Sequence, residues 1–206
     1  MKILLQLFIL SISSTLLYSQ VGLGITNPTA ALEIKTENTG IAALGLSPQT
    51  NPSGTQTGQM AVIGGILYMF DAIRDKWLSV ENTGLEFGRR GSGSDPAEVE
   101  FGGGDLQTGP TMPFDGTIVG INMSAGADNS REIFLFINDV AVPNNDSNIH
   151  VDGVFILDQT TLQYQDNDYN LDFQAGDIIR FSIDSVVDDI ESLIINLQVR
   201  WRKDNS

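Results

Sequence analysis

The sequence predicts an all-β protein in which an antiparallel sandwich follows an extended N-terminal segment. Runs rich in Ile, Val and Phe recur in the C-terminal half, separated by Asn, Asp and Gly, without the 3.6-residue apolar stripe of a helix. The 21 Gly residues are also typical of a turn-rich chain. Every second residue from Leu193 to Trp201 is apolar, whereas Asn196 and Gln198 lie on the alternate face, so one face of this strand is expected to be buried.

Residues 1–19 have the features of a secretory signal peptide. Lys2 precedes the apolar run Ile3–Leu10, and Ser19 provides a small residue immediately before Gln20. The apolar core of about a dozen residues is shorter than the roughly 20 residues of a bilayer-spanning helix. We therefore expect a mature chain without a transmembrane segment, secreted or at the cell surface, with the periplasm as the alternative location.

Composition limits the classes of partner. The formal net charge of −15 and the scarcity of clustered Lys and Arg argue against nucleic acid as a ligand. The chain contains no cysteine, so disulfides, thiol catalysis and zinc–thiolate sites are excluded. Stability must come from packing or from oligomerisation.

Residues 20–83 are expected to form a slender β-stalk that ends in a hairpin. Apolar residues alternate in Val21–Ile25 and in Leu32–Ile34, which predicts short strands with one apolar face. Such short strands cannot form a core alone, so that face must be buried against another copy or the next domain. The segment Pro48–Gln59 lacks large apolar side chains and is expected to be a loop.

The hairpin is predicted from two apolar runs around a charged turn, Gly65–Asp71 and Lys76–Val80. An isolated hairpin is marginal in water, so it must pack on something. We place the boundary between stalk and head between residues 83 and 84.

Residues 84–206 are expected to form the head. Its predicted strands share a high content of Ile, Val, Leu and Phe. They are Gly116–Met123, Glu132–Ile137, Val151–Leu157, Asp177–Ile183 and Leu193–Trp201.

Several segments resemble known families. Leu171–Phe181, with its Gly-Asp pair, resembles a segment of the trimeric jelly rolls of the complement and tumour-necrosis-factor superfamily. Pro113–Ile121 is similar to the strand that opens the globular tips of bacterial collagen-like spore-surface glycoproteins and some phage tail-fibre heads, although this chain has no Gly-X-Y repeat. Gln20–Pro28 and Ala31–Ile34 resemble the start of exported surface and fibre proteins of the Bacteroidota, and Tyr68–Val80 resembles their hairpin between stalk and head. The resemblance implies a jelly-roll head and a homotrimer, whose three-fold closure would bury the apolar runs of the stalk.

No enzymatic activity is expected. His150 is the single histidine, and no Gly-x-Ser-x-Gly elbow accompanies it. Paired carboxylates such as Asp166 with Asp168 or Asp188 with Asp189 are typical of solvated acidic turns, and the substrate platform of a glycoside hydrolase is missing.

A calcium site is the one cofactor hypothesis that the sequence supports. Hard oxygen ligands recur at the offsets of a calcium loop, at Asp166, Asp168, Asn170, Asp172 and Asp177. Leu171 occupies the position where the helix-flanked calcium loop needs Gly, so a plain acidic turn is the alternative.

A second polar cluster is a candidate for ligand contact, because loops at the apex of a sandwich commonly bind ligands. It comprises Asn144, Asn145, Asp146, Asn148 and His150.

The function expected from these observations is adhesion or structural display by a trimeric, non-enzymatic, exported surface or fibre protein. Its partner would be a surface glycan or a protein receptor, bound by three weak sites acting together. A calcium-dependent, lectin-like carbohydrate-binding module is one alternative, and an envelope structural component without ligand is another.

Overall fold

A computed structural model describes residues 21–23, 32–37, 40–89, 97–102, 109–126, 132–142, 154–156, 162–184 and 192–205. The chain divides into two compact units, Met1–Ser47 and Pro48–Ser206. Every regular element in the described part is a strand, so the all-β prediction is confirmed there. Within these ranges, no helix has the length and apolarity needed to cross a bilayer.

The first unit contains two short strands, β1 (Val21–Leu23) and β2 (Leu32–Ile34), which pair in parallel with Val21 opposite Leu32. Both lie where the alternation of apolar residues predicts strands. In the rest of this unit, every residue from 40 to 47 is exposed.

The second unit contains fourteen strands that belong to one connected, mostly antiparallel sheet. Four of them form the region of the hairpin: β3 (Pro48–Gln49), β4 (Met60–Ile63), β5 (Ile66–Asp71) and β6 (Lys76–Ser79). The other ten are β7 (Thr83–Arg89), β8 (Ala97–Phe101), β9 (Gly116–Ser124), β10 (Glu132–Ile137), β11 (Val140–Ala141), β12 (Val154–Ile156), β13 (Gln163–Asp166), β14 (Leu171–Phe173), β15 (Ile179–Asp184) and β16 (Leu193–Asp204).

Strands β7 to β16 form a sandwich-like region, hereafter the sandwich. One layer has β16 at its centre between β7 and β9, and β9 also pairs with β13 and β14. The other layer joins β8, β15 and β10, with β11 and β12 on the far side of β10. Strand β8 connects the layers, because it pairs with both β7 and β15.

The core of the sandwich is built from the inward residues of both layers. On β16, Leu193, Ile195, Leu197 and Val199 are all fully buried, which confirms the face predicted from their spacing. Phe181 of β15 packs edge-on against the ring of Phe87 from β7, with 5.0 Å between ring centroids, so aromatic side chains fill the space between layers.

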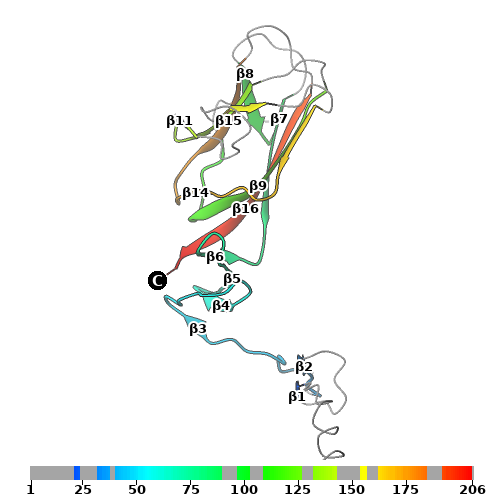
Figure 1. Cartoon of the computed structure of the whole chain (residues 1–206), viewed down its shortest axis with the longest axis vertical. Coiled ribbons are helices and arrows are strands. Elements are labelled where there is room, and N and C mark those ends of the chain that lie inside the picture. The colour runs from blue at the N-terminus through cyan, green and yellow to red at the C-terminus, as the bar shows by residue number, and fades with distance from the viewer. Residues whose placement is uncertain are drawn as a thin grey trace, which may run out of the picture. The chain divides into compact units, whose positions relative to one another are not determined.

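The strands β4 to β6 form a second, smaller core. Its buried members are Ala61, Ile63, Tyr68, Phe70 and Trp77. Trp201 packs against both this cluster and the core of the sandwich. Strand β16, drawn in red in Figure 1, therefore joins the two, since its last residues pair with β6.

The predicted strands of the hairpin and head are confirmed, with ends shifted by a few residues. Strands β4, β7, β8, β11, β13 and β14 were not expected from the sequence, and β3 lies within the predicted loop Pro48–Gln59. The hairpin lies in the same compact unit as the sandwich. The functional boundary between residues 83 and 84 stays a prediction.

The Gly-Asp turn before β15 has the geometry expected of it. Gly176 has a φ of 94°, a region that favours glycine. The Asp177 carboxylate accepts hydrogen bonds from the backbone N–H of Gln174 at 2.7 Å and from the Asn138 amide at 2.6 Å. This turn is therefore held by one local hydrogen bond and by one from Asn138, which follows β10.

Candidate functional site

The two polar clusters singled out in the sequence have different outcomes. Asn144, Asn145, Asp146, Asn148 and His150 lie outside the described residues, so the ligand-loop prediction stays a prediction. The five calcium candidates are all described.

Four of the five calcium candidates accept hydrogen bonds from protein groups through their side chains. The Asp166 carboxylate accepts a hydrogen bond from the backbone N–H of Asp168, whereas Asn170 and Asp172 accept hydrogen bonds from Lys76. Asp177 caps the turn described above. In the described ranges, no three acidic or histidine side chains are grouped as they would be around a metal ion. The structure thus shows hydrogen bonds to other protein groups for the side chains of Asp166, Asn170, Asp172 and Asp177, and calcium binding stays a prediction.

Lys76 lies at the centre of a polar joint between the hairpin and the sandwich. Its side chain is 10% exposed, and Nζ donates to Oδ1 and Oδ2 of Asp172 at 2.7 and 2.9 Å and to the Asn170 amide oxygen at 3.0 Å. The fully buried Thr117 donates its hydroxyl to Asp172 Oδ1 at 2.7 Å. We call Lys76, Thr117, Asn170 and Asp172 the lysine joint; it ties β6 to β9 and β14.

The electrostatics of Asp172 reflect these partners. Partial burial raises the pKa of this carboxyl, but the hydrogen bonds from Lys76 and Thr117 and the positive charges of Lys76 and Arg202 outweigh burial and lower the pKa overall. Asp172 is therefore ionised at neutral pH and holds the Lys76 ammonium in place.

A second contact supports the same junction. Arg74, in the turn between β5 and β6, donates to Asp71 at 2.7 Å and to the carbonyl oxygen of Tyr169 at 3.2 Å. Tyr169 is buried in the core of the sandwich, and burial, followed by the nearby Tyr164 and Asp166, raises the pKa of its phenol. The turn of the hairpin is thus anchored on the segment that precedes β14.

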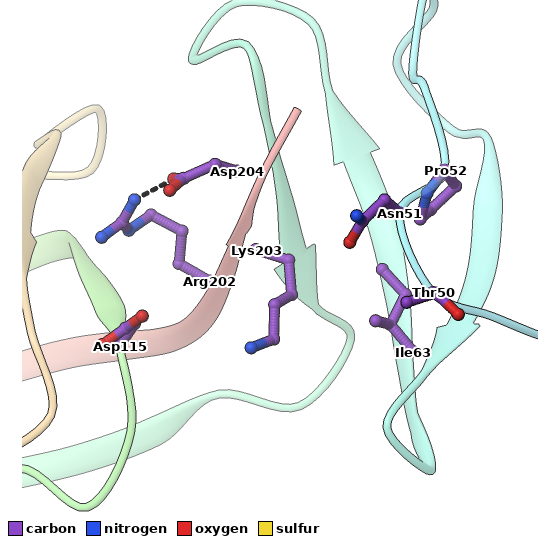
Figure 2. Close-up of a pocket in the computed structure, with 8 residues that line it drawn as sticks. All are labelled: Thr50, Asn51, Pro52, Ile63, Asp115, Arg202, Lys203 and Asp204. Atoms are coloured by element: carbon purple, nitrogen blue, oxygen red, sulfur yellow. Dashed lines mark hydrogen bonds and ion pairs between the residues drawn. The ribbon is translucent and has the colours of Figure 1, made fainter. Parts of the chain in front are cut away.

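A pocket of about 230 Å³ lies between the end of β16 and the loop that follows β3. In the view of Figure 2, Lys203 separates two groups of lining residues. They are Asp115, Arg202 and Asp204 on one side and Thr50, Asn51, Pro52 and Ile63 on the other.

The charges of this pocket are balanced. Arg202 forms an ion pair with Asp204, and Asp115 accepts a hydrogen bond from the backbone N–H of Ala175 at 2.9 Å. The Lys203 ammonium makes no hydrogen bond within the described part of the chain, and its charge brings the lining to two cations and two carboxylates. The sequence did not indicate this site, because its residues come from segments far apart in the chain.

A third polar feature lies on the outer face of the sandwich layer that contains β16. Hydrogen-bonding register aligns one residue from each of four adjacent strands. They are Glu86, Asn196, Asn122 and Gln165, hereafter the amide row. A depression of about 180 Å³ on this face is lined by Asn122, Met123, Ser124, Gln163, Tyr164, Gln165 and Asn196.

Comparison with known proteins identified no relative of this chain. No family model matches the chain, and neither a curated protein nor a solved structure is significantly similar to it.

Proposed function

We propose that the protein is a non-enzymatic, exported surface or fibre protein that assembles as a homotrimer. In this proposal residues 20–47 form a β-stalk, and the sandwich is a jelly-roll head that serves adhesion or structural display. The hairpin joins stalk and head.

The observation that carries the proposal is the exposure of apolar side chains just before the second unit. Ile41, Leu44 and Leu46 are 63%, 60% and 39% exposed, and every residue from 40 to 47 is exposed in the described chain. A contiguous apolar stretch without a cover marks an interaction surface. Because the chain has no cysteine to staple this segment, burial between copies is the available source of stability.

The lysine joint, which connects the hairpin to the sandwich, also supports the proposal. An adhesive or structural head must stay fixed to the part that carries it. Lys76 and Asp172 provide that fixation, since they connect the hairpin to the sandwich through a nearly buried ammonium with three hydrogen bonds.

Light scattering coupled to size-exclusion chromatography tests the proposal on the full chain expressed with its own leader. We expect a trimer, both in calcium and in chelator. A triple variant Ile41→Ser, Leu44→Ser and Leu46→Ser should be a monomer that keeps its circular dichroism, because the altered residues contribute to no core.

The matched control replaces three exposed apolar residues of the second unit, Ile73→Ser, Val80→Ser and Val140→Ser. This control should remain trimeric. A monomeric wild-type chain, or a trimer that persists in the 41/44/46 variant, would contradict the proposed stalk. A trimer that forms only in calcium would instead assign a structural metal to the Asp166–Asp177 segment.

A further inference from the structure

The amide row is a polar surface whose side chains are mostly unused by the fold. Within the described chain, the side chains of Asn122 and Asn196 make no hydrogen bond, while Gln165 donates one to Asn167 at 3.0 Å. Gln163, from the neighbouring row, also makes none and lines the same depression. The row crosses three strand-to-strand gaps, which amounts to roughly 14 Å at the usual spacing of about 4.8 Å. Amide donors and acceptors therefore form a continuous strip on one face of the sheet.

Asn122 and Asn196 have a low intrinsic preference for the strand positions that they occupy. They lie directly opposite each other on β9 and β16, two strands in the interior of this layer. Asn is depleted in strands, where Thr or Val would fit a half-exposed face better. Positions at which a sequence opposes its local structure are commonly functional. The pair is thus explained more readily by a bound partner than by the fold.

The charge of this face also differs from that of the whole chain. The protein has 26 acidic residues and a net charge of −15, but the amide row includes a single charged side chain, Glu86, at its edge. The neighbouring row consists of Gly88, Ile194, Ser124 and Gln163, with no charge at all. A solvated face in so acidic a chain would carry more carboxylates, so the single charge on these two rows favours a neutral partner.

We propose that the amide row binds a neutral carbohydrate, with Asn122 and Asn196 as the central contacts. A primary amide both donates and accepts hydrogen bonds, as does each sugar hydroxyl, so amides pair with a polyol without needing a counter-charge. The depression of about 180 Å³ is smaller than the pockets of drug-sized ligands and suits one sugar unit of a chain that continues along the strip. Binding at this site needs no calcium, since no acidic cluster takes part.

This inference rests on the proposed adhesive function, for which it names a ligand class and a site. The trimer would present three such faces, and weak sites that act together give useful avidity.

The test is native affinity electrophoresis of the full chain in gels that contain a neutral glucan, mannan or galactan, with polygalacturonate as the acidic probe. We expect retardation by at least one neutral polysaccharide, unchanged by chelator, and none by polygalacturonate. The double variant Asn122→Thr and Asn196→Thr should weaken binding about tenfold, because it removes the two central amides that hydrogen-bond the sugar hydroxyls. Thr favours the strand, so this variant is expected to fold.

Gln174→Thr is the matched control, since Gln174 is exposed in the turn before β15 and its side chain makes no hydrogen bond in the described chain. It should bind as the wild type does. Three results would overturn the inference: no retardation by any neutral probe, unchanged binding by the double variant, or loss of the trimer in that variant, which would make the row a contact between copies. A wild-type trimer that binds no neutral polysaccharide refutes this inference alone, whereas a monomer that binds refutes the trimer alone.

Discussion

The lysine joint and the amide row are both polar clusters on the same sandwich layer, yet they are built in opposite ways. In the joint, the Lys76 ammonium makes three hydrogen bonds, and both oxygens of Asp172 accept from it. In the row, Asn122 and Asn196 make no side-chain hydrogen bond within the described chain.

The difference teaches which polar groups hold the fold and which are left for a partner. A nearly buried charge is costly unless it is paired, so the joint must be complete for the protein to be stable. An exposed amide is satisfied by water at little cost, so the row can be changed without unfolding the protein. Stability measurements should therefore separate the two clusters clearly.

The largest effect is expected from Asp172→Ala. This change leaves the Lys76 ammonium nearly buried with Asn170 as its remaining partner and removes the acceptor of the Thr117 hydroxyl. We expect a loss of about 3 kcal/mol in the free energy of unfolding, measured by urea denaturation. Asp168→Ala, at an exposed carboxylate two residues before Asn170 with no side-chain hydrogen bond to the members of the joint, is the control and should stay within about 0.5 kcal/mol of the wild type.

Lys76→Met should cost less, about 1 kcal/mol in the same assay. The Asp172 side chain left behind is 43% exposed, so water can replace the ammonium, and methionine retains the apolar stem. If Lys76→Met and Asp172→Ala lowered the free energy of unfolding equally, the loss of the ion pair, rather than the burial of an unpaired lysine, would account for the destabilisation.

In the amide row, substitutions are expected to stabilise the protein rather than destabilise it. Asn122→Thr and Asn196→Thr should each raise the free energy of unfolding by about 0.5 kcal/mol, because Thr is favoured in a strand and no hydrogen bond within the described chain is lost. Thermal unfolding followed by circular dichroism measures the gain. A lower midpoint for either variant would mean that these amides hold the fold, and the contrast with the joint would disappear.

The smallest effect is the pH dependence of the joint, because water screens the half-exposed carboxylate of Asp172. Its pKa in the folded state lies below the ordinary value of 3.8, so its contribution to stability is complete above that value and is lost as the pH falls through the folded pKa. Asp172→Asn cannot titrate, so its urea midpoint should fall less steeply than that of the wild type below pH 3.8. Parallel curves would exclude Asp172 as a source of acid sensitivity.

The sequence predicted the parts of the fold that carry a strong apolar period. Leu193 to Val199 alternate without interruption, and every predicted inward residue there is buried. Strand β7 was missed because its outward positions include Gly84 and Gly88, residues that weaken a strand pattern and that are typical of turns. Pairing along β16 overrides this local preference.

The polar sites could be predicted only in part, since they depend on register and long-range contact. Asn170 and Asp172 were noticed as oxygen-rich residues, but their partner Lys76 is more than ninety positions earlier in the chain. Asn196 was assigned correctly to the exposed face of its strand. Its alignment with Asn122 and Gln165 follows from the pairing of three strands, which a single sequence does not reveal.

Strand β16 has a mechanical consequence. It pairs with β6, β7 and β9, and Trp201 near its end contacts both hydrophobic clusters. Hydrogen bonds between antiparallel strands run perpendicular to the strands, so a force along β16 loads several of them in shear at once. In the proposed adhesive role, a pull on the chain would thus be resisted through one continuous strand, and the hairpin and the sandwich would yield to tension together.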